Sequence, residues 1–296
     1  MKKDKIQELI SQMTLEEKAG MCSGADFWHL KGIERLGIPQ VMVTDGPHGI
    51  RKQAEAADHL GINESEKAVC FPAGCATASS FDRDLIRRQG EILGQECQAL
   101  NVSTILGPAM NIKRSPLCGR NFEYYSEDPV VSGELGAAFI NGLQSVGVSC
   151  CVKHFACNNI EYRRNFSDSR MTERTLREIY LKAFEIIVKK ASPRAIMCAY
   201  NLVNGVFCSE NKKLLTDVLR GEWNFGGIVV SDWGAVVNEA AAVKAGLDLA
   251  MPEGEIYKRL KLSYGKGEIT ETEISASADR VAKFILDCVD NRKNYV

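Results

Sequence analysis

Short apolar runs alternate with longer amphipathic stretches along the 296-residue chain. Each apolar run is continuous rather than interrupted at every second position, which is typical of parallel strands buried on both faces. The pattern therefore predicts strands at residues 38–44, 102–106, 148–152, 195–199, 228–231 and 247–251, with a weaker candidate at 68–77.

The stretches between these runs carry helix signals. Thr14 and Glu17 form a capping box, in which each side chain accepts a hydrogen bond from the backbone amide of the other. Asp128 and Pro129 provide an N-cap and a first-turn proline for a helix over 130–144. Further helices are predicted at 171–190, 211–222 and 275–290. Alternating strands and helices in one chain indicate a parallel α/β fold.

The length selects among such folds. A single α/β barrel typically takes about 250 residues, so 296 residues fit one barrel domain over 1–296. Six or seven strands are convincing, rather than eight. We therefore predict a TIM-like (β/α)8 barrel that is irregular in its first repeat.

Charge and composition restrict the partners. The chain has 37 basic and 38 acidic residues, so its formal net charge of −1 favours neither nucleic acid nor a membrane surface. No apolar run reaches the roughly 18 residues of a membrane span, and no secretory signal follows the basic start, so we expect a cytoplasmic protein. The 11 cysteines are irregularly spaced and are interpreted as reduced core residues. Neither a metal-ligand cluster nor a nucleotide-binding glycine loop is found, which predicts no metal and no cofactor.

Polar residues follow the apolar runs at their carboxyl ends, the side of a barrel that carries the chemistry. Five or six separate strands thus deliver polar groups to one rim, a pattern that core packing alone rarely produces. The residues are Asp45, Arg120, Glu123, Lys153, His154, Tyr200, Asn201, Asp232, Met251 and Glu253.

Each of these residues also has a simpler interpretation. An aspartate that closes a strand is often the N-cap of the next helix. Arg120 could pair with Glu123 or Glu127, and His29 and His48 could be structural or solvated. Two observations favour a site: a lysine at the end of a buried strand needs a partner or a ligand, and a tryptophan directly follows Asp232.

Seven segments of the chain carry a family resemblance. In order they are MTLEEK at 13–18, TDGPHGI at 44–50, GRNFEYYSEDP at 119–129, KHFACNN at 153–159, AYNLVNG at 199–205, VVSDWG at 229–234 and AGLDLAMP at 245–252. They are distributed across nearly the whole chain, and several are long. The sequence thereby resembles glycoside hydrolase family 3, in its β-glucosidase and β-xylosidase branch.

The resemblance implies a retaining, exo-acting β-glycosidase (β-glucosidase-like) that hydrolyses terminal non-reducing β-linked sugars without a cofactor. Asp232 matches the catalytic nucleophile. It further implies that Asp45, Arg120, Lys153, His154 and Tyr200 hold the terminal sugar, with Arg164, Met197, Trp233 and Met251 at more peripheral subsite positions. It also suggests a cis peptide bond at Lys153–His154, at His154–Phe155 or at both.

One departure from the family pattern concerns the general acid. A retaining glycosidase needs a second carboxyl group about 5–5.5 Å from the nucleophile. In this branch a C-terminal α/β sandwich domain supplies that glutamate, and this domain is absent from the chain. The single-domain branch of β-N-acetylhexosaminidases carries a His-Gly-Asp-type loop instead, but here Ala-Cys-Asn-Asn follows Phe155. We therefore expect a sandwich domain as a partner, in a longer protein or in a split enzyme.

Two other functions stay open at this point. The chain could be a sugar-binding or scaffold domain that is inactive without a second domain. It could also be a lyase or aldolase barrel in which Lys153 forms a Schiff base, although the sugar-hydrolase motifs count against this.

Overall fold

The computed structural model describes residues 3–54, 63–252, 254 and 256–294. The α-helices are α1 Lys3–Ser11, α2 Leu15–Met21, α3 Gly74–Ala78, α4 Arg83–Ala99, α5 Pro129–Ser145, α6 Glu173–Thr175, α7 Lys182–Ala191, α8 Glu239–Ala245, α9 Ile256–Gly265 and α10 Glu271–Asp290. Tighter or wider helical turns are η1 Glu34–Leu36, η2 Leu176–Tyr180, η3 Cys208–Glu210 and η4 Lys213–Glu222. The strands are β1 His29–Leu30, β2 Val41–Thr44, β3 Thr104–Ile105, β4 Ser149–Phe155, β5 Asp168–Ser169, β6 Ala195–Cys198, β7 Leu202–Val203, β8 Val206–Phe207 and β9 Ile228–Val230.

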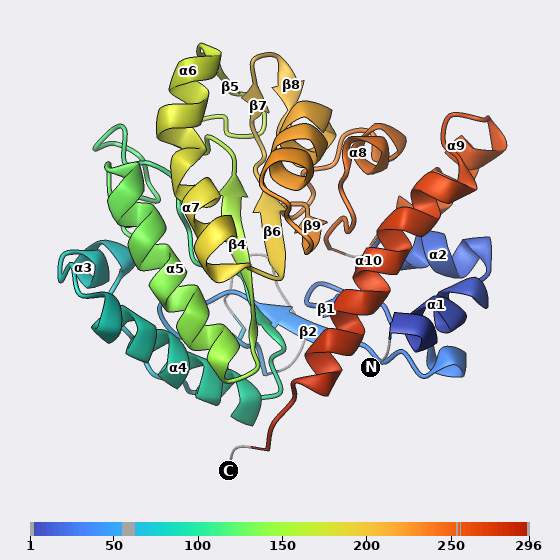
Figure 1. Cartoon of the computed structure of the whole chain (residues 1–296), viewed down its shortest axis with the longest axis horizontal. Coiled ribbons are helices and arrows are strands. Elements are labelled where there is room, and N and C mark those ends of the chain that lie inside the picture. The colour runs from blue at the N-terminus through green and yellow to red at the C-terminus, as the bar shows by residue number, and fades with distance from the viewer. Residues whose placement is uncertain (1–2, 55–62, 253, 255, 295–296) are drawn as a thin grey trace.

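Six strands form a sheet in the order β1-β2-β3-β4-β6-β9, around which the helices are arranged (Figure 1). Within this sheet, β2, β3, β4, β6 and β9 are parallel to one another, whereas β1 is antiparallel to β2. Single-residue bridges then join Val230 to Leu249, Ser23 to Ala250 and Gly24 to Leu30, and they lead from β9 back to β1. The ring is a TIM-like barrel, and the predicted irregularity lies at its antiparallel first strand.

Helices α4, α5 and α7 pack side by side over one flank of the sheet, and α10 runs across the other (Figure 1). A glycine permits the closest approach of α4 and α5, because a Cβ atom on Gly142 would lie 2.1 Å from the carbonyl oxygen of Arg87. Below these helices Phe155 of β4 packs edge-on against Phe184 and Trp223. This aromatic cluster anchors β4 from outside the barrel.

The structure confirms the predicted capping box at Thr14 and the helix that begins after Asp128. The predicted helix at 171–190 is divided by a wider turn, in which the Leu181 amide donates to the carbonyl of Leu176 over 2.9 Å. The predicted strand at 68–77 is wrong. The amides of Val69 and Phe71 donate to Glu96 and His48 rather than to a ladder, and the segment ends in α3.

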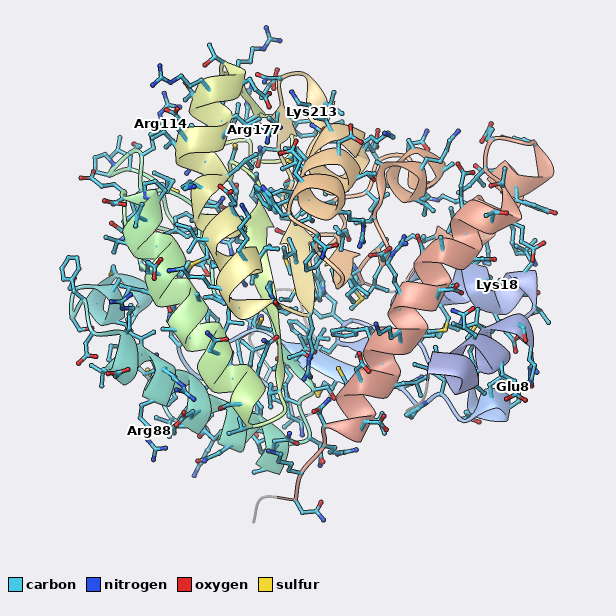
Figure 2. All side chains as sticks on the ribbon, viewed as in Figure 1. Glu8, Lys18, Arg88, Arg114, Arg177 and Lys213 are labelled. Carbon is cyan, nitrogen blue, oxygen red and sulfur yellow. The ribbon has the colours of Figure 1, made fainter. Side chains whose placement is uncertain are left out.

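Charged side chains cover the outside of the molecule, where Figure 2 labels Arg88, Arg177 and Lys213. Many form exposed ion pairs, such as that of Arg177 with Glu222 over 2.8 Å, and such pairs contribute little to stability. All 11 cysteines are free, and Cys150, Cys151 and Cys198 are buried as expected, but Cys70 is exposed and Cys75 is half-buried, so these two are not core residues. Within the described ranges, no helix combines the length and the apolarity that a membrane crossing requires.

A buried ion cluster ties three elements together beneath the barrel. Asp248, which is 1% exposed, accepts hydrogen bonds from Arg220 of η4 over 2.5 Å and from Arg280 of α10 over 2.7 Å. It also accepts from the Val229 amide of β9 over 2.7 Å. Removing one member of a buried pair leaves the other charge without compensation, so the cluster is costly to break.

We predict that Asp248→Asn lowers the free energy of unfolding by about 3–5 kcal/mol, because a neutral amide turns one N–H group toward two arginines. The matched control is Asp217→Asn. Asp217 lies in η4, as Arg220 does, but its ion pair with Lys212 is exposed, so a loss below about 1 kcal/mol is expected. Urea denaturation of both variants measures the difference. Equal losses would mean that the cluster has no special role.

Candidate active site

A cavity of about 850 Å³ opens at the carboxyl ends of the barrel strands. Its wall is built from the turn after β2, the loop after β3, the end of β4, the segment after β6 and the segment after β9. The sequence-predicted residues that line it are Asp45, Arg120, Lys153, His154, Arg164, Met197, Tyr200, Asp232 and Trp233.

Asp232 lies two residues beyond the end of β9 and is 8% exposed. Its Oδ1 atom accepts the backbone N–H of Trp233 over 2.8 Å, which fixes the carboxylate plane. Its Oδ2 atom is buried and accepts no hydrogen bond from the described residues. Burial raises the pKa of Asp232 overall, although Arg120 and the Trp233 amide oppose the rise. The result is a buried carboxylate with one oxygen free.

His154 explains why this oxygen has no partner. Its Nε2 atom lies 3.7 Å from Asp232 Oδ2, while its Nδ1 atom lies 3.3 Å from the amide oxygen of Asn111. Because the Asn111 amide oxygen can only accept a hydrogen bond, the His154 ring proton belongs on Nδ1. The Nε2 atom therefore has no proton to donate to Asp232. Burial, together with Arg120 and Lys153, holds the pKa of His154 well below its usual value, so the ring is neutral.

Asn111 also holds the backbone of this histidine. Its side chain donates to the His154 carbonyl over 2.8 Å and accepts the His154 amide over 2.9 Å. The Lys153–His154 peptide bond is cis, as the family resemblance suggested. The second cis bond is not at His154–Phe155 but one residue later, at Phe155–Ala156. The side chains of Lys153 and His154 both line the cavity, near the end of β4.

Asp45 is the acceptor for two cations on the same wall. Lys153 Nζ lies 3.2 Å from its Oδ1 atom, and an Arg51 Nη atom lies 3.5 Å from its Oδ2 atom. Burial opposes ionisation of Asp45, but Lys153 and Arg51 outweigh it and lower its pKa. A tight turn brings Arg51 back to Asp45. Gly46 has a φ of +121°, and a Cβ atom there would lie 2.0 Å from the carbonyl oxygen of Gly49.

Two further arginines in the wall are each held by a glutamate three residues away. Arg120 donates its Nε–H to Glu123. This is the ion pair that the sequence offered as an alternative, yet Arg120 still lines the cavity. Arg164 donates to Glu161 over 2.8 Å and stacks over the ring of Tyr200, with its guanidinium carbon 4.5 Å from the ring centre.

Aromatic rings close the side of the cavity next to Asp232. Trp233 lies 5.8 Å from Trp28 and 6.3 Å from Phe27, measured between ring centres. Its indole N–H donates to the Phe27 carbonyl over 3.0 Å, and the Tyr200 hydroxyl donates to the Trp233 carbonyl over 2.7 Å. These rings give an apolar face of the kind that packs against the C–H side of a sugar.

Glu123, expected at this rim, lies in the wall, whereas other wall residues were missed by sequence reasoning, among them Phe27, Trp28 and Arg51. Arg51 directly follows the TDGPHGI motif, so it had a signal in the sequence. Phe27 and Trp28 precede the short antiparallel β1, which no apolar run announces.

Two residues expected at this rim are absent from the cavity wall, namely Asn201 and Met251. Asn201 is 1% exposed, and its side-chain N–H donates to the Ala156 carbonyl over 3.2 Å. Met251 is 1% exposed, belongs to the core beside Gly24, and is absent from the cavity wall. Its backbone, not its side chain, serves the site, because its carbonyl accepts the Gly234 amide over 2.8 Å. Glu253, also expected at this rim, lies outside the described residues.

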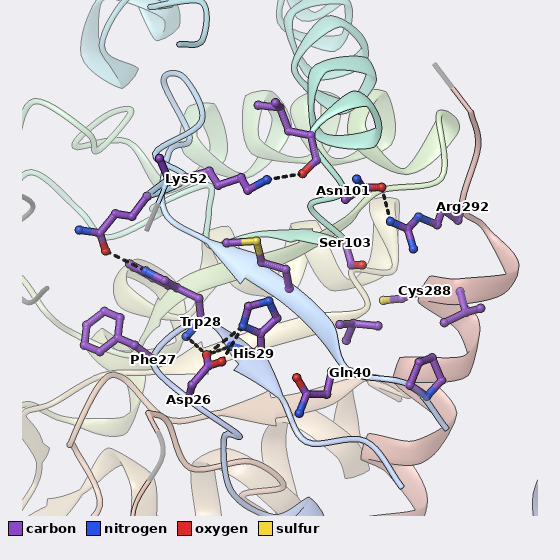
Figure 3. A pocket seen from close by; sticks show the side chains of 17 residues that line it. Asp26, Phe27, Trp28, His29, Gln40, Lys52, Asn101, Ser103, Cys288 and Arg292 are labelled. Atoms are coloured by element: carbon purple, nitrogen blue, oxygen red, sulfur yellow. Dashed lines mark hydrogen bonds and ion pairs between the residues drawn. The ribbon is translucent and has the colours of Figure 1, made fainter. Parts of the chain in front are cut away.

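A second cavity of about 810 Å³ lies behind Phe27 and Trp28, which line both (Figure 3). It contains an Asp26–His29 ion pair of 2.8 Å and the contact of Arg292 with Asn101. Trp28 is fixed between the two cavities by donating its indole N–H to Gln53 over 3.0 Å. Phe27 and Trp28 line both cavities, whereas the charged residues described for the first cavity line only that one, namely Asp45, Arg51, Arg120, Lys153, Arg164 and Asp232. In the part of the chain that the structure describes, no three His, Cys, Asp or Glu side chains gather as a metal site.

Known proteins match this chain along almost its whole length. The family described as "Glycosyl hydrolase family 3 N terminal domain" matches residues 29–284. The thermostable β-glucosidase B of Acetivibrio thermocellus is 55% identical over 290 residues, which are 97% of this chain and 38% of that protein. The exo-α-(1→6)-L-arabinopyranosidase of Bifidobacterium longum is 47% identical over 285 residues, which are 96% of this chain and 37% of that protein.

Solved structures agree. The β-glucosidase 3B of Thermotoga neapolitana, determined in complex with α-D-glucose, superposes with a TM-score of 0.91 at 37% identity. The match covers 98% of this chain and 44% of that one. The chain thus spans well under half the length of these relatives. The matched family model, the high identities and the shared fold agree with the motif resemblance, and the chain belongs to glycosyl hydrolase family 3 as an N-terminal domain of that family.

Proposed function

We propose that this chain is the nucleophile-bearing barrel domain of a retaining, exo-acting β-glycosidase, with terminal β-glucosides as the favoured substrates. The observation that carries the proposal is the free Oδ2 atom of Asp232, buried in a cavity rimmed by cations and aromatic rings. A buried carboxylate oxygen without a partner is costly, and it is what a nucleophile requires.

In the proposed reaction, Asp232 Oδ2 attacks the anomeric carbon, the bond to the leaving oxygen breaks, and a glycosyl ester forms on Asp232. His154 Nε2 can accept a sugar hydroxyl proton, while Lys153 and Arg120 can donate to sugar oxygens. Asp45 can accept hydroxyls beside them. Tyr200, Arg164, Met197 and Trp233 complete the wall around the sugar and its leaving group.

The leaving oxygen needs a proton, and four carboxyl groups on or near the cavity wall are held by cations instead. Asp45 is held ionised by its cations, and Glu123 is bound to Arg120. Glu161 and Asp168, the first candidates on the following loop, are paired with Arg164 and Arg170. We therefore propose that a further domain, an α/β sandwich, supplies the acid. The greater length of the relatives supports further domains.

The two other functions have less support. A scaffold or sugar-binding domain would not need the costly free oxygen of Asp232. A Schiff-base enzyme needs a lysine that is a free amine, whereas Lys153 donates to Asp45 in an ion pair. The sugar itself is less narrowly determined, because one relative is named an arabinopyranosidase. A panel of aryl β-glucosides, β-xylosides and α-L-arabinopyranosides identifies the preferred sugar.

For localisation we propose a reducing, cytoplasmic compartment. The support is that all 11 cysteines are unpaired and that burial raises the pKa of thiols such as Cys22 to about 12.

Incubation with an activated 2-deoxy-2-fluoro aryl glucoside should add one glycosyl mass to the chain, at Asp232. An acidic phenol leaves with little protonation, and the fluorine slows hydrolysis of the ester. Intact-mass and peptide mass spectrometry measure the adduct. Asp232→Asn should abolish it, whereas Asp217→Asn, on the exposed surface, should leave it unchanged. Labelling that persists in Asp232→Asn would sink the assignment.

The same chain should hydrolyse cellobiose about 10²–10⁴-fold more slowly than an efficient relative, because general acid assistance typically contributes that much. Glucose release from cellobiose and from a dinitrophenyl glucoside gives the comparison. Rapid turnover of cellobiose would require an acid within this barrel, and Glu161→Gln and Asp168→Asn would then locate it.

The labelling rate should fall at acidic pH, and the midpoint of the fall should lie above 3.8, the ordinary pKa of an aspartate. Burial raises the pKa of Asp232, so protonation removes the nucleophile at a higher pH than usual. The neutral His154 should add no step near pH 6.5. Rates from pH 3 to 8, with thermal melts at each pH to exclude unfolding, test this. A fall in rate centred at or below pH 3.8 would contradict the raised pKa of Asp232.

A further inference from the structure

Glu123 is a buried carboxylate for which the proposed reaction has no direct use. It is 5% exposed and lines the cavity, and its carboxylate accepts from Arg120. Its backbone is held on both sides. The Glu123 amide donates to the Arg120 carbonyl over 3.1 Å, and a Cβ atom on Gly74 of α3 would lie 2.3 Å from the Glu123 carbonyl oxygen. The carboxylate is therefore fixed in place.

Arg120 also acts on the nucleophile, which lies in the same cavity wall. Arg120 is the leading cation that opposes the rise in the pKa of Asp232, and Asp232 in turn helps to raise the pKa of Arg120. Burial would lower the pKa of this arginine, but Glu123, Tyr124 and Asp232 together outweigh it and raise the pKa. The two carboxylates thus compete for one guanidinium, and the structure has it bound to Glu123.

We infer that Glu123 is a positioning residue that holds Arg120 by its Nε–H, away from Asp232 Oδ2, so that the nucleophile stays unpaired. The inference rests on the proposed function of Asp232. Glu123 accepts the Nε–H group of Arg120. The terminal N–H groups of Arg120 donate to no described residue, so they are available for a sugar hydroxyl in the cavity. Without Glu123, the same guanidinium would form an ion pair with Asp232 and cover the attacking oxygen.

The test is Glu123→Gln, which keeps the shape and removes the charge. We expect the plateau rate of Asp232 labelling by the 2-fluoro glucoside to fall about 10- to 100-fold, the effect of one hydrogen bond to a charged group. The pH–rate profile falls at acidic pH, and we call this fall the acidic limb. We also expect the acidic limb to move to lower pH, because the loss of the Glu123 charge and a closer Arg120 both favour ionised Asp232. The other groups that face Asp232 are unchanged in this variant, namely His154, Lys153, Arg164 and Tyr200.

The matched control is Glu161→Gln, because Glu161 also holds a wall arginine three residues away. That pair is partly exposed, with side-chain exposures of 37% and 25%, so solvent screens its charge and the limb should move much less. A crystal structure of Glu123→Gln completes the test, with a guanidinium nitrogen expected within about 3.2 Å of Asp232 Oδ2.

The outcomes separate the two proposals. If the wild-type chain is not labelled at Asp232, the proposed function fails, and the crystal structure of the variant still decides where Arg120 goes. If the wild type is labelled, and Glu123→Gln leaves both the limb and the place of Arg120 unchanged, the positioning role is overturned. A purely structural role would lower the melting temperature without moving the limb. Should Glu123→Gln not fold, Glu123→Asp keeps the charge but loosens the contact, and an unmoved limb there overturns the inference equally.

Discussion

The free oxygen of Asp232 is the constraint around which the cavity is organised. A carboxylate that is 8% exposed needs nearby positive charge, yet a cation in direct contact would occupy the oxygen that has to react. The structure meets both needs by pairing each nearby cation with a different carboxylate. Lys153 contacts Asp45, Arg120 contacts Glu123 and Arg164 contacts Glu161, so all three act on Asp232 from a distance.

The barrel supplies the fixed part of this arrangement. Asp232, Lys153 and His154 lie at the ends of parallel strands, where the backbone is rigid and all strand ends point to one rim. The two arginines come from loops, and each is fixed by a glutamate of the same loop rather than by the sheet. Rigid strands therefore place the nucleophile, while short-range ion pairs place the groups that bind around it.

This division decides what the sequence could predict. Strand ends can be located from apolar runs, so Asp45, Lys153, His154 and Asp232 were expected at one rim and lie in one cavity wall. The pattern failed where hydrogen bonds leave the sheet, as at 68–77, whose amides donate to Glu96 and His48.

Met251 shows the limit of the same rule. Its run joins the ring through single bridges at Leu249 and Ala250, and the next side chain turns into the core instead of the cavity. Arg51 and Glu123 depend on a turn and an ion pair, which motif spacing suggests but apolar periodicity does not reveal.

The charge balance of this network bears on the second half of the proposed reaction. With Asp232 ionised, this network contains four cations, Arg51, Arg120, Lys153 and Arg164, and four carboxylates, Asp45, Glu123, Glu161 and Asp232. Asp45 contacts two of the cations, whereas Asp232 is influenced by them from a distance. His154 adds no charge because it is neutral. Formation of an ester on Asp232 removes one negative charge and leaves four cations facing three carboxylates. The positive potential that remains favours departure of Asp232 as a carboxylate. The arrangement that keeps the nucleophile ionised before attack therefore also favours its release from the glycosyl ester.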